Sequence, residues 1–373
     1  MKSSICFISP RLFLYLSPGS GKPAGGAQRQ QSMISSALAY RGYDVSAIVA
    51  DYGQPARVIY SGVELIKGVP EAVSGIPSVL RALYGLARAM VKSSADAFLV
   101  RGAPRLATAA CLIAKALGKQ FIFRVANDSD VDPSYLRSRY PRPFVNLYGL
   151  VVRYADAVIA QTERQQQLLI EHFNTEVSLV PNGYDLPSER MVLSHKKRNH
   201  VLWVGSSDPE KKNPHLFLQL AERLPDLTFT MISKPIAGKE DFHYELQQEA
   251  AAVFNLRFVG PVAPNEIHDY YKTAMTLVNT SDYEGFPNTF LEAWRYETPI
   301  ASLYFDLDGL LESECGGVKA GSMKKLVVAV DRLSADSQYR AALGKEGREY
   351  MKEHFSLDTV VDLYEKAFER ALS

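Results

Sequence analysis

Cysteine is scarce in this chain of 373 residues, and the three present, Cys6, Cys111 and Cys315, are far apart in the sequence. Domains that rely on disulfides carry more cysteines, and structural zinc sites need cysteines or histidines at short, regular spacings. The seven histidines are scattered as well, with no pair at ligand spacing. The composition therefore excludes a disulfide framework and a cysteine-histidine metal cluster, and it favours a reducing, cytoplasmic setting.

Long apolar runs are also missing. A helix that spans a bilayer needs about 20 consecutive, mainly apolar residues, and no segment of this sequence reaches that length. The stretch 1–20 has a short apolar strand but no pattern typical of a signal cleavage site. We expect a protein that does not cross a membrane, although it could still contact one.

The charge is nearly balanced overall, with 42 Lys and Arg against 41 Asp and Glu, but it is distributed unevenly. Residues 1–190 contain 21 basic and 14 acidic residues, whereas residues 191–373 contain 21 and 27. A basic first half suggests an anionic partner for that half. Nucleic acid is a weak candidate, because the arginines are not interleaved with stacking aromatics in a recognisable nucleic-acid-binding motif.

Short apolar runs alternate with amphipathic stretches along the chain, which is the pattern of βαβ units and parallel sheets. A chain of this length is expected to form two domains. We predict an α/β protein with two doubly wound, Rossmann-like domains, residues 1–185 and 186–356, with a polar linker at 186–199. The predicted strands are 4–9, 45–50, 97–100, 120–125, 157–160, 177–180, 200–204, 227–232, 256–259, 275–279 and 300–304. The predicted helices are 28–41, 77–92, 104–117, 162–172, 214–223, 241–253, 264–273 and 287–296, with further helices from about 321 onward.

The stretch 281–300, SDYEGFPNTFLEAWRYETPI, carries two carboxylates, Glu284 and Glu292, eight residues apart. Glycine permits a tight turn and proline fits the first position of a helix, so we predict that a helix begins near Pro287 and Asn288. Glu284 then precedes the helix and Glu292 lies on it. Amides at a helix start favour phosphate, and carboxylates accept hydrogen bonds from hydroxyls. The pattern suits a ligand with phosphate in the middle and hydroxylated rings at both ends, as in a nucleotide sugar.

Three motifs in register resemble family 4 retaining glycosyltransferases of the GT-B fold. The stretch around Glu284 and Glu292 is similar to the E-x7-E signature of that family. Residues 180–185, VPNGYD, are similar to the motif that closes its N-terminal domain, and residues 204–213 to its phosphate-binding loop. The resemblance covers nearly the whole chain. It implies two Rossmann-like domains that face a central cleft, with an acceptor bound by residues 1–185 and a nucleotide-sugar donor bound by residues 186–356. It also implies that the C-terminal helix, 357–373, packs back on the N-terminal domain.

The resemblance assigns catalytic roles to Glu284, which would contact hydroxyls of the transferred sugar, and to Lys211, which would bind the diphosphate. Both acids must reach the ligand for this hypothesis to hold. Asn127 stands where family members often carry a histidine that contacts the sugar, and Asp128 stands beside it; both are predicted site residues. In the same family, transfer proceeds with retention, the departing diphosphate takes the acceptor's proton, and no metal or other cofactor is expected.

The remaining predicted contacts to the donor also come from the resemblance. Glu292 would hold the ribose. Ser206 replaces the arginine that the family usually has, which weakens the expected phosphate clamp, and Lys212 or an arginine from the other domain could compensate. A glycine pair, Gly25 and Gly26, matches the one that opens the family's first helix. The other predicted donor contacts are Gly205, Asn182, Gly285, Phe286 and Asn288.

The function predicted in this way is hexosyl transfer from a nucleoside-diphosphate sugar to a glycan or lipid-linked acceptor, in polysaccharide, lipopolysaccharide or glycoconjugate synthesis. Two alternatives remain open: a nucleotide-sugar epimerase or hydrolase in the same fold, and a catalytically inactive partner protein that keeps the fold. Acidic D-x-D patterns at 128–132 and 306–308 are interpreted as turns, not as metal sites.

A basic stretch with aromatic residues suggests contact with a membrane. Its arginines are Arg137, Arg139, Arg142 and Arg153, and its large apolar residues are Tyr135, Tyr140, Phe144, Tyr148 and Leu150. Such a segment could lie on an anionic membrane surface, which would place the protein peripherally on the inner face of the membrane. A solvated face over a packed helix explains the pattern equally well.

Overall fold

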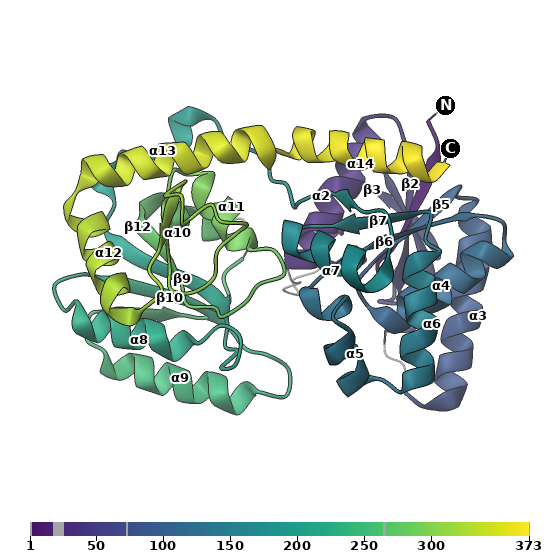
Figure 1. Cartoon of the computed structure of the whole chain (residues 1–373), viewed down its shortest axis with the longest axis horizontal. Helices are drawn as coiled ribbons and strands as arrows, with labels where there is room; N and C mark the ends of the chain where they lie inside the picture. Colours follow the sequence, from purple (N-terminus) through teal and green to yellow (C-terminus); the bar gives the residue numbers. More distant parts are fainter. Residues whose placement is uncertain (1, 18–25, 72–73, 264–265, 373) are drawn as a thin grey trace. The chain divides into compact units, whose positions relative to one another are not determined.

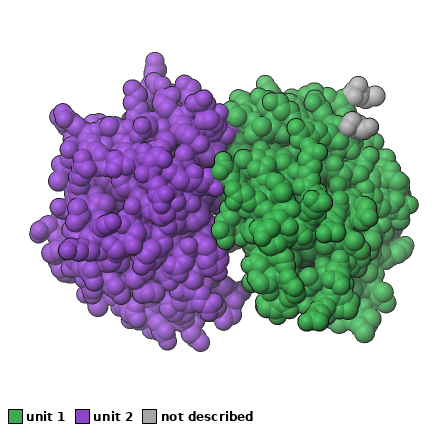
Figure 2. Space-filling view, viewed as in Figure 1, with its two compact units in different colours: residues 1–183, 357–373 green, residues 184–356 purple. Residues whose placement is uncertain are grey.

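The computed structural model describes residues 2–17, 26–71, 74–263 and 266–372. The chain divides into two compact units (Figure 2): unit 1 comprises residues 1–183 and 357–373, and unit 2 comprises residues 184–356. Each unit has a parallel or largely parallel sheet covered by helices (Figure 1), which confirms the predicted α/β fold. Tyr184 and Asp185, which the sequence-based boundary assigned to the first domain, belong to unit 2.

The sheet of unit 1 has the strand order β3-β4-β2-β1-β5-β6-β7-β8. Its strands are β1 (Ser4–Ile8), β2 (Asp44–Ala50), β3 (Arg57–Tyr60), β4 (Val63–Val69), β5 (Ala97–Arg101), β6 (Gln120–Arg124), β7 (Ala157–Ala160) and β8 (Ser178–Leu179). Among the strand pairs of the described residues in this sheet, only β3–β4 is antiparallel. This hairpin is absent from the sequence-based prediction. It closes through Ser61 and Gly62, which both have positive φ angles, as a tight two-residue hairpin turn requires.

Side chains alternate between the two faces of this sheet and build two cores. Ile5 and Phe7 of β1 pack with α2 (Gly26–Tyr40) and α14 (Leu357–Leu372) on one face. Cys6 and Ile8 pack on the other face. That face is covered by α3 (Gly75–Ser93), α4 (Pro104–Ala116), α5 (Pro133–Arg139), α6 (Arg142–Arg153) and α7 (Glu163–Phe173). The period of two along the strand is what places one apolar layer on each side of the sheet.

The sheet of unit 2 is parallel throughout, in the order β11-β10-β9-β12-β13-β14. Its strands are β9 (His200–Ser206), β10 (Phe229–Lys234), β11 (Leu256–Val259), β12 (Ala274–Asn279), β13 (Ile300–Ser302) and β14 (Gly317–Lys319). The helices are α8 (Pro214–Arg223), α9 (Glu240–Ala252), α10 (Ile267–Thr273), α11 (Asn288–Trp294), α12 (Met323–Ala335) and α13 (Ser337–His354). The strand order reverses between β9 and β12, and such a switch point opens a crevice for ligands at the carboxyl ends of the strands.

Unit 2 should lose stability in mild acid because of His200 at the start of β9. Burial lowers the pKa of His200 from 6.5 to about 4. Between pH 6.5 and about 4 the unfolded chain binds a proton at His200 that the folded unit does not bind. The contribution of neutral His200 to the free energy of unfolding is therefore complete above pH 6.5 and is lost as the pH falls to about 4. A shift of this size corresponds to roughly 3 kcal/mol in the free energy of unfolding.

The test compares urea unfolding of the wild type and His200→Leu at about pH 7, 5.5 and 4. The variant should lose less stability than the wild type by roughly 3 kcal/mol over this range. His354→Leu, a change at an exposed histidine, is the control and should follow the wild type. If the free energy of unfolding fell equally with pH in His200→Leu and the wild type, His200 could not be the cause of the lost stability.

Candidate functional site

Two loops of unit 2 meet at the switch point of its sheet. Residues 207–213 follow β9, and residues 280–287 follow β12. The hydroxyl of Thr280 donates to the carbonyl of Lys212 at 2.6 Å, and the amide of Asp282 donates to the carbonyl of Lys211 at 3.2 Å. These bonds hold the two lysines of one loop against the other loop, at the sheet edge where ligands of such folds bind.

Glu284 lies at the centre of this arrangement. Its carboxylate pairs with the ammonium group of Lys212, accepts a hydrogen bond from Ser281 Oγ at 2.7 Å, and lies 4.0 Å from Lys211 Nζ. Burial opposes ionisation of Glu284, but the charges of Lys212 and Lys211 outweigh it and lower the pKa of the carboxyl group. The carboxylate is therefore charged at neutral pH, and two cations face it.

Glu292 lies on α11 and is held by two tyrosines. Tyr184 donates its hydroxyl to Oε1 at 3.2 Å, and Tyr271 donates to Oε2 at 2.8 Å. Both predicted acids are mostly buried within unit 2, Glu284 at 9% and Glu292 at 7% exposed. Each is thus less accessible than the sequence-based hypothesis required, and a ligand would have to reach a small exposed part of each carboxylate.

Lys234 is a further cation, near Lys212 and Glu292, and sequence reasoning missed it. It ends β10, opposite Ser206 of β9. Burial lowers its pKa, and the charge of Lys212 adds to this effect, whereas the charge of Glu292 opposes it. A lysine at the carboxyl end of a strand next to the phosphate-loop motif was the signal that could have identified it.

Gly205 has a packing role in the structure, and its contact with a ligand stays a prediction. It lies inside β9, so the backbone is extended at this residue. A Cβ at this position would lie 2.6 Å from the ring of Trp203, so the glycine makes room for the indole. The parts of this motif at the sheet edge are Ser206, the last residue of β9, and the lysines Lys211 and Lys212 in the loop that follows.

Helix α11 begins at Asn288, close to the predicted start, but has only seven residues. The amide of Asn288 donates to the carbonyl of Phe286 at 3.0 Å, and Phe286 packs edge-on against Phe355. The predicted cradle of amides at Gly285, Phe286 and Asn288 is therefore partly occupied by bonds within the protein. A helix this short also has few aligned peptide dipoles.

In unit 1 the structure corrects the interpretation of Asn182. Its side chain is completely buried and accepts a hydrogen bond at 2.8 Å from the guanidinium of Arg124. It holds the loop from inside and does not offer its amide to a ligand. Gly26 is the first residue of α2, and Gln30 on that helix accepts a hydrogen bond from the amide of Gly183. The predicted contact at Gly25 lies outside the described residues.

Asn127 and Asp128 follow β6. Asn127 caps a short 3-10 helix, Asp128–Asp130, with which it forms a capping box. Asp128 pairs with Arg164 at 3.0 Å and accepts from Gln165 at 3.2 Å. The two predicted site residues are adjacent at the carboxyl edge of the sheet, and both have partners within unit 1.

A serine-histidine cluster at the carboxyl ends of β9 and β10 was not predicted. The hydroxyl of Ser207 lies 2.8 Å from that of Ser233 and hydrogen-bonds to Nδ1 of His243 on α9. Burial lowers the pKa of His243. Residues 36 positions apart form this contact, so no spacing in the sequence could indicate it.

Within the ranges given above, no group of three or more His, Cys, Asp or Glu side chains is arranged to hold a metal ion. Among the helices that the structure describes, none is long and apolar enough to cross a bilayer.

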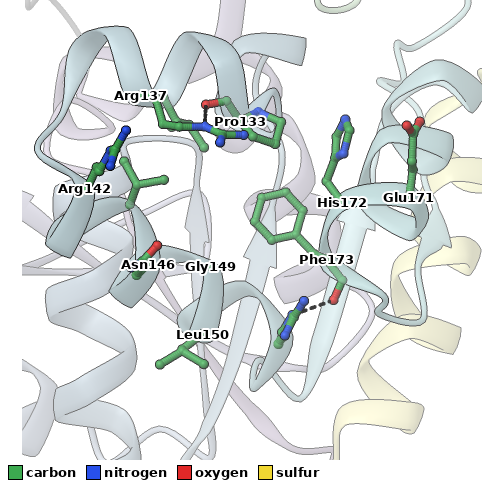
Figure 3. Close-up of a pocket in the computed structure, with 12 residues that line it drawn as sticks. Pro133, Arg137, Arg142, Asn146, Gly149, Leu150, Glu171, His172 and Phe173 are labelled. Carbon is green, nitrogen blue, oxygen red and sulfur yellow. Dashed lines mark hydrogen bonds between the residues drawn. The ribbon is translucent and has the colours of Figure 1, made fainter.

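A groove of about 840 Å³ in unit 1 lies apart from all the predicted site residues. Figure 3 shows its lining: Arg137 and Arg142 on one side, and Glu171, His172 and Phe173 from the end of α7 on the other. Arg153 also lines it and donates from Nε to the carbonyl of Phe173 at 3.0 Å. The groove is basic and partly apolar, and none of the predicted donor contacts borders it.

Two family models match the chain: a glycosyl transferase 4-like domain over residues 25–183 and glycosyl transferases group 1 over residues 188–350. The chain is 30% identical over 260 residues to the alpha-galactosylglucosyldiacylglycerol synthase of Streptococcus pneumoniae, an alignment that covers 63% of this chain and 69% of that protein. The chain belongs to the group 1 glycosyltransferases, of the family 4 type.

Solved structures show which fold this glycosyltransferase adopts. Sucrose-phosphate synthase from Thermosynechococcus elongatus superimposes with a TM-score of 0.76 at 18% identity, over 99% of this chain and 100% of that one. Anabaena HepE in complex with UDP-glucose superimposes with a TM-score of 0.72 at 16% identity, over the same shares. The GT-B fold implied by the three sequence motifs is confirmed.

Proposed function

We propose that this glycosyltransferase moves a hexose from a nucleoside-diphosphate sugar to a glycan or lipid-linked acceptor, with retention at the anomeric carbon. The observation that carries the proposal is the group at the switch point of unit 2, where Lys211 and Lys212 face the charged carboxylate of Glu284. Cations at this place suit a diphosphate, and a carboxylate beside them suits the hydroxyls of the sugar next to it.

In this proposal each residue acts on a defined part of the donor. Lys211 and Lys212 bind the diphosphate and stabilise the charge that develops on it as the glycosidic bond breaks. Glu284 accepts hydrogen bonds from the transferred sugar, and Glu292 accepts from the ribose. Because no second acid-base pair is assigned, the departing diphosphate takes the acceptor's proton. The protein's part is to position the substrates and stabilise charge, without a metal or other cofactor.

The proposed donor and acceptor classes are supported by the relatives and structural neighbours of this chain. HepE was solved with UDP-glucose, so a uridine nucleotide heads the donors to be tested. The name of the pneumococcal relative indicates a glycosylated diacylglycerol product, which favours a lipid-linked acceptor and a cytoplasmic protein that contacts the membrane peripherally. Polysaccharide or lipopolysaccharide synthesis is the other setting for a glycan acceptor.

The test is thermal unfolding with a panel of UDP-, GDP- and ADP-sugars. A ligand that binds only the folded state stabilises it by about 2.7 kcal/mol at a concentration 100 times its dissociation constant. One donor should raise the melting temperature clearly, and the double variant Lys211→Gln with Lys212→Gln should abolish the rise. If no nucleotide sugar stabilises the protein, an inactive partner protein becomes the better account; interconversion of two nucleotide sugars without acceptor would instead indicate an epimerase.

A further inference from the structure

The first half of α3 carries large apolar side chains that have no core to pack against. Ile76 is 77% exposed, Leu80 62% and Tyr84 68%. Val79 and Leu83 are exposed as well. At about 100° per residue, these five positions fall on one side of the helix. We call them the α3 face. A surface helix ordinarily turns such a stripe toward the core, whereas here the stripe faces solvent.

The contact between α3 and the sheet explains this orientation. The helix crosses β4 where Gly85 meets Gly68, so closely that a Cβ on Gly85 would lie 2.3 Å from the carbonyl oxygen of Gly68. The buried side chains of α3, Leu86, Ala89 and Met90, all follow this crossing. Only the second half of the helix is therefore anchored on the sheet, and the α3 face precedes the anchor.

Helix α3 and its neighbour α4 carry basic residues and no acidic ones. They contain no aspartate or glutamate. Their basic residues are Arg81, Arg88, Lys92, Arg105 and Lys115, of which Lys115 pairs with Asp156. Figure 1 shows α3 next to α4, and α6 packs against α4. On the helix itself, Arg81, Arg88 and Lys92 project together, next to the apolar stripe.

We propose that the α3 face docks unit 1 on an anionic lipid bilayer. Apolar side chains would enter the region between headgroups and acyl chains, while the arginines and lysines beside them pair with lipid phosphates. A second copy of the chain is the less suitable occupant, because two α3 faces would bring like charges together. This surface differs from the basic aromatic stretch at 135–153 singled out in the sequence, where Tyr148 is completely buried in the core.

The experiment is co-sedimentation with vesicles of phosphatidylcholine alone or with about 30% phosphatidylglycerol, at low and high salt. Wild-type protein should bind the anionic vesicles at low salt. The double variant Leu80→Ser with Tyr84→Ser should bind about ten-fold more weakly, because it removes apolar area from the face and leaves every cation in place. A matched control, Tyr244→Ser with Phe254→Ser, changes exposed aromatics of unit 2 and should bind as the wild type does.

A second readout reports insertion directly. The only tryptophans, Trp203 and Trp294, are buried, so a Tyr84→Trp variant adds one exposed indole whose emission should shift to the blue with anionic vesicles. The proposal fails if the wild type does not sediment with anionic vesicles, or if the Leu80 and Tyr84 variant binds as tightly as the wild type. It also fails if the wild type forms a concentration-dependent dimer that the Leu80 and Tyr84 variant cannot form, and does not bind vesicles. Binding needs no sugar transfer, so it should persist in Glu284→Gln, which separates it from the proposed function.

Discussion

Replacing Glu284 by glutamine is expected to lower kcat/KM by about 100- to 1000-fold while unit 2 stays folded. The amide has nearly the shape of the carboxylate, so the packing around it is retained. It lacks the negative charge that faces Lys211 and Lys212, and its NH2 group donates where the carboxylate accepted. Initial rates should be measured with the nucleotide sugar that stabilises the wild type most.

The matched control is Glu312→Gln. Glu312 pairs with Lys319 at 2.5 Å, as Glu284 pairs with Lys212, but it is exposed, and Lys319 belongs to the edge strand β14. Its removal should change kcat/KM by less than about two-fold, because exposed ion pairs contribute little. If Glu284→Gln kept more than half of the wild-type rate, Glu284 could not be the residue that contacts the transferred sugar.

Glu284→Gln should also change how the stability of the protein depends on pH. The lowered pKa of Glu284 means that its ion pair stabilises the folded unit above the ordinary carboxyl value of 4.5, and that this contribution is lost as the pH falls below 4.5. Glu284→Gln has no such group to protonate. Its stability should fall less steeply than that of the wild type below pH 4.5, which distinguishes loss of the charge from general damage to the fold.

The sequence predicted most of the local structure, because the signals for it are local. The strand 157–160 and the helix 214–223 are found with the predicted bounds, and α11 begins at Asn288 after Pro287. Apolar runs, a proline and a glycine are sufficient to place such elements. The hairpin β3–β4 was not predicted, because its strands RVIY and VELIKGV lack a regular alternation of apolar and polar residues, although Ser61 and Gly62 form its turn.

The candidate site was only partly predictable, because its contacts join distant parts of the chain. Lys212 and Glu284 are 72 residues apart, and the E-x7-E stretch gives no indication which lysine pairs with the acid. Lys234 lies opposite Ser206 only because β10 pairs with β9 in the sheet. Burial is a property of the folded unit, so the sequence could not show that Glu292 is enclosed by two tyrosines.

Replacing Arg124 by alanine is expected to reduce the free energy of unfolding of unit 1 by about 3–5 kcal/mol. Arg124 ends β6, is buried, and donates from Nη2 to Asn182 Oδ1 at 2.8 Å and to the carbonyl of Pro181 at 3.2 Å. Its guanidinium also lies 5.4 Å from the ring centroid of Tyr364 on α14. The variant would leave buried acceptors without donors and a cavity under the loop.

The cause can be resolved with two further variants and a control. Arg124→Met fills most of the cavity but donates nothing, and Asn182→Ala removes one of the acceptors. If the unpaired acceptors cause most of the lost stability, Arg124→Met should be nearly as unstable as Arg124→Ala. Adding Asn182→Ala to Arg124→Met should then lower the free energy of unfolding only a little further. Arg164→Ala, at an exposed arginine paired with Asp128, should change stability by less than about 1 kcal/mol.

Urea unfolding at neutral pH measures these differences. A loss below about 1 kcal/mol in Arg124→Ala would contradict the account, since it would mean that water or a neighbour replaces the guanidinium without cost. The outcome matters for the site as well. The loop that Arg124 holds ends at Gly183, whose amide donates to Gln30 on α2, so a loosened loop should also disturb the start of that helix, where Gly26 was predicted to contact the ligand.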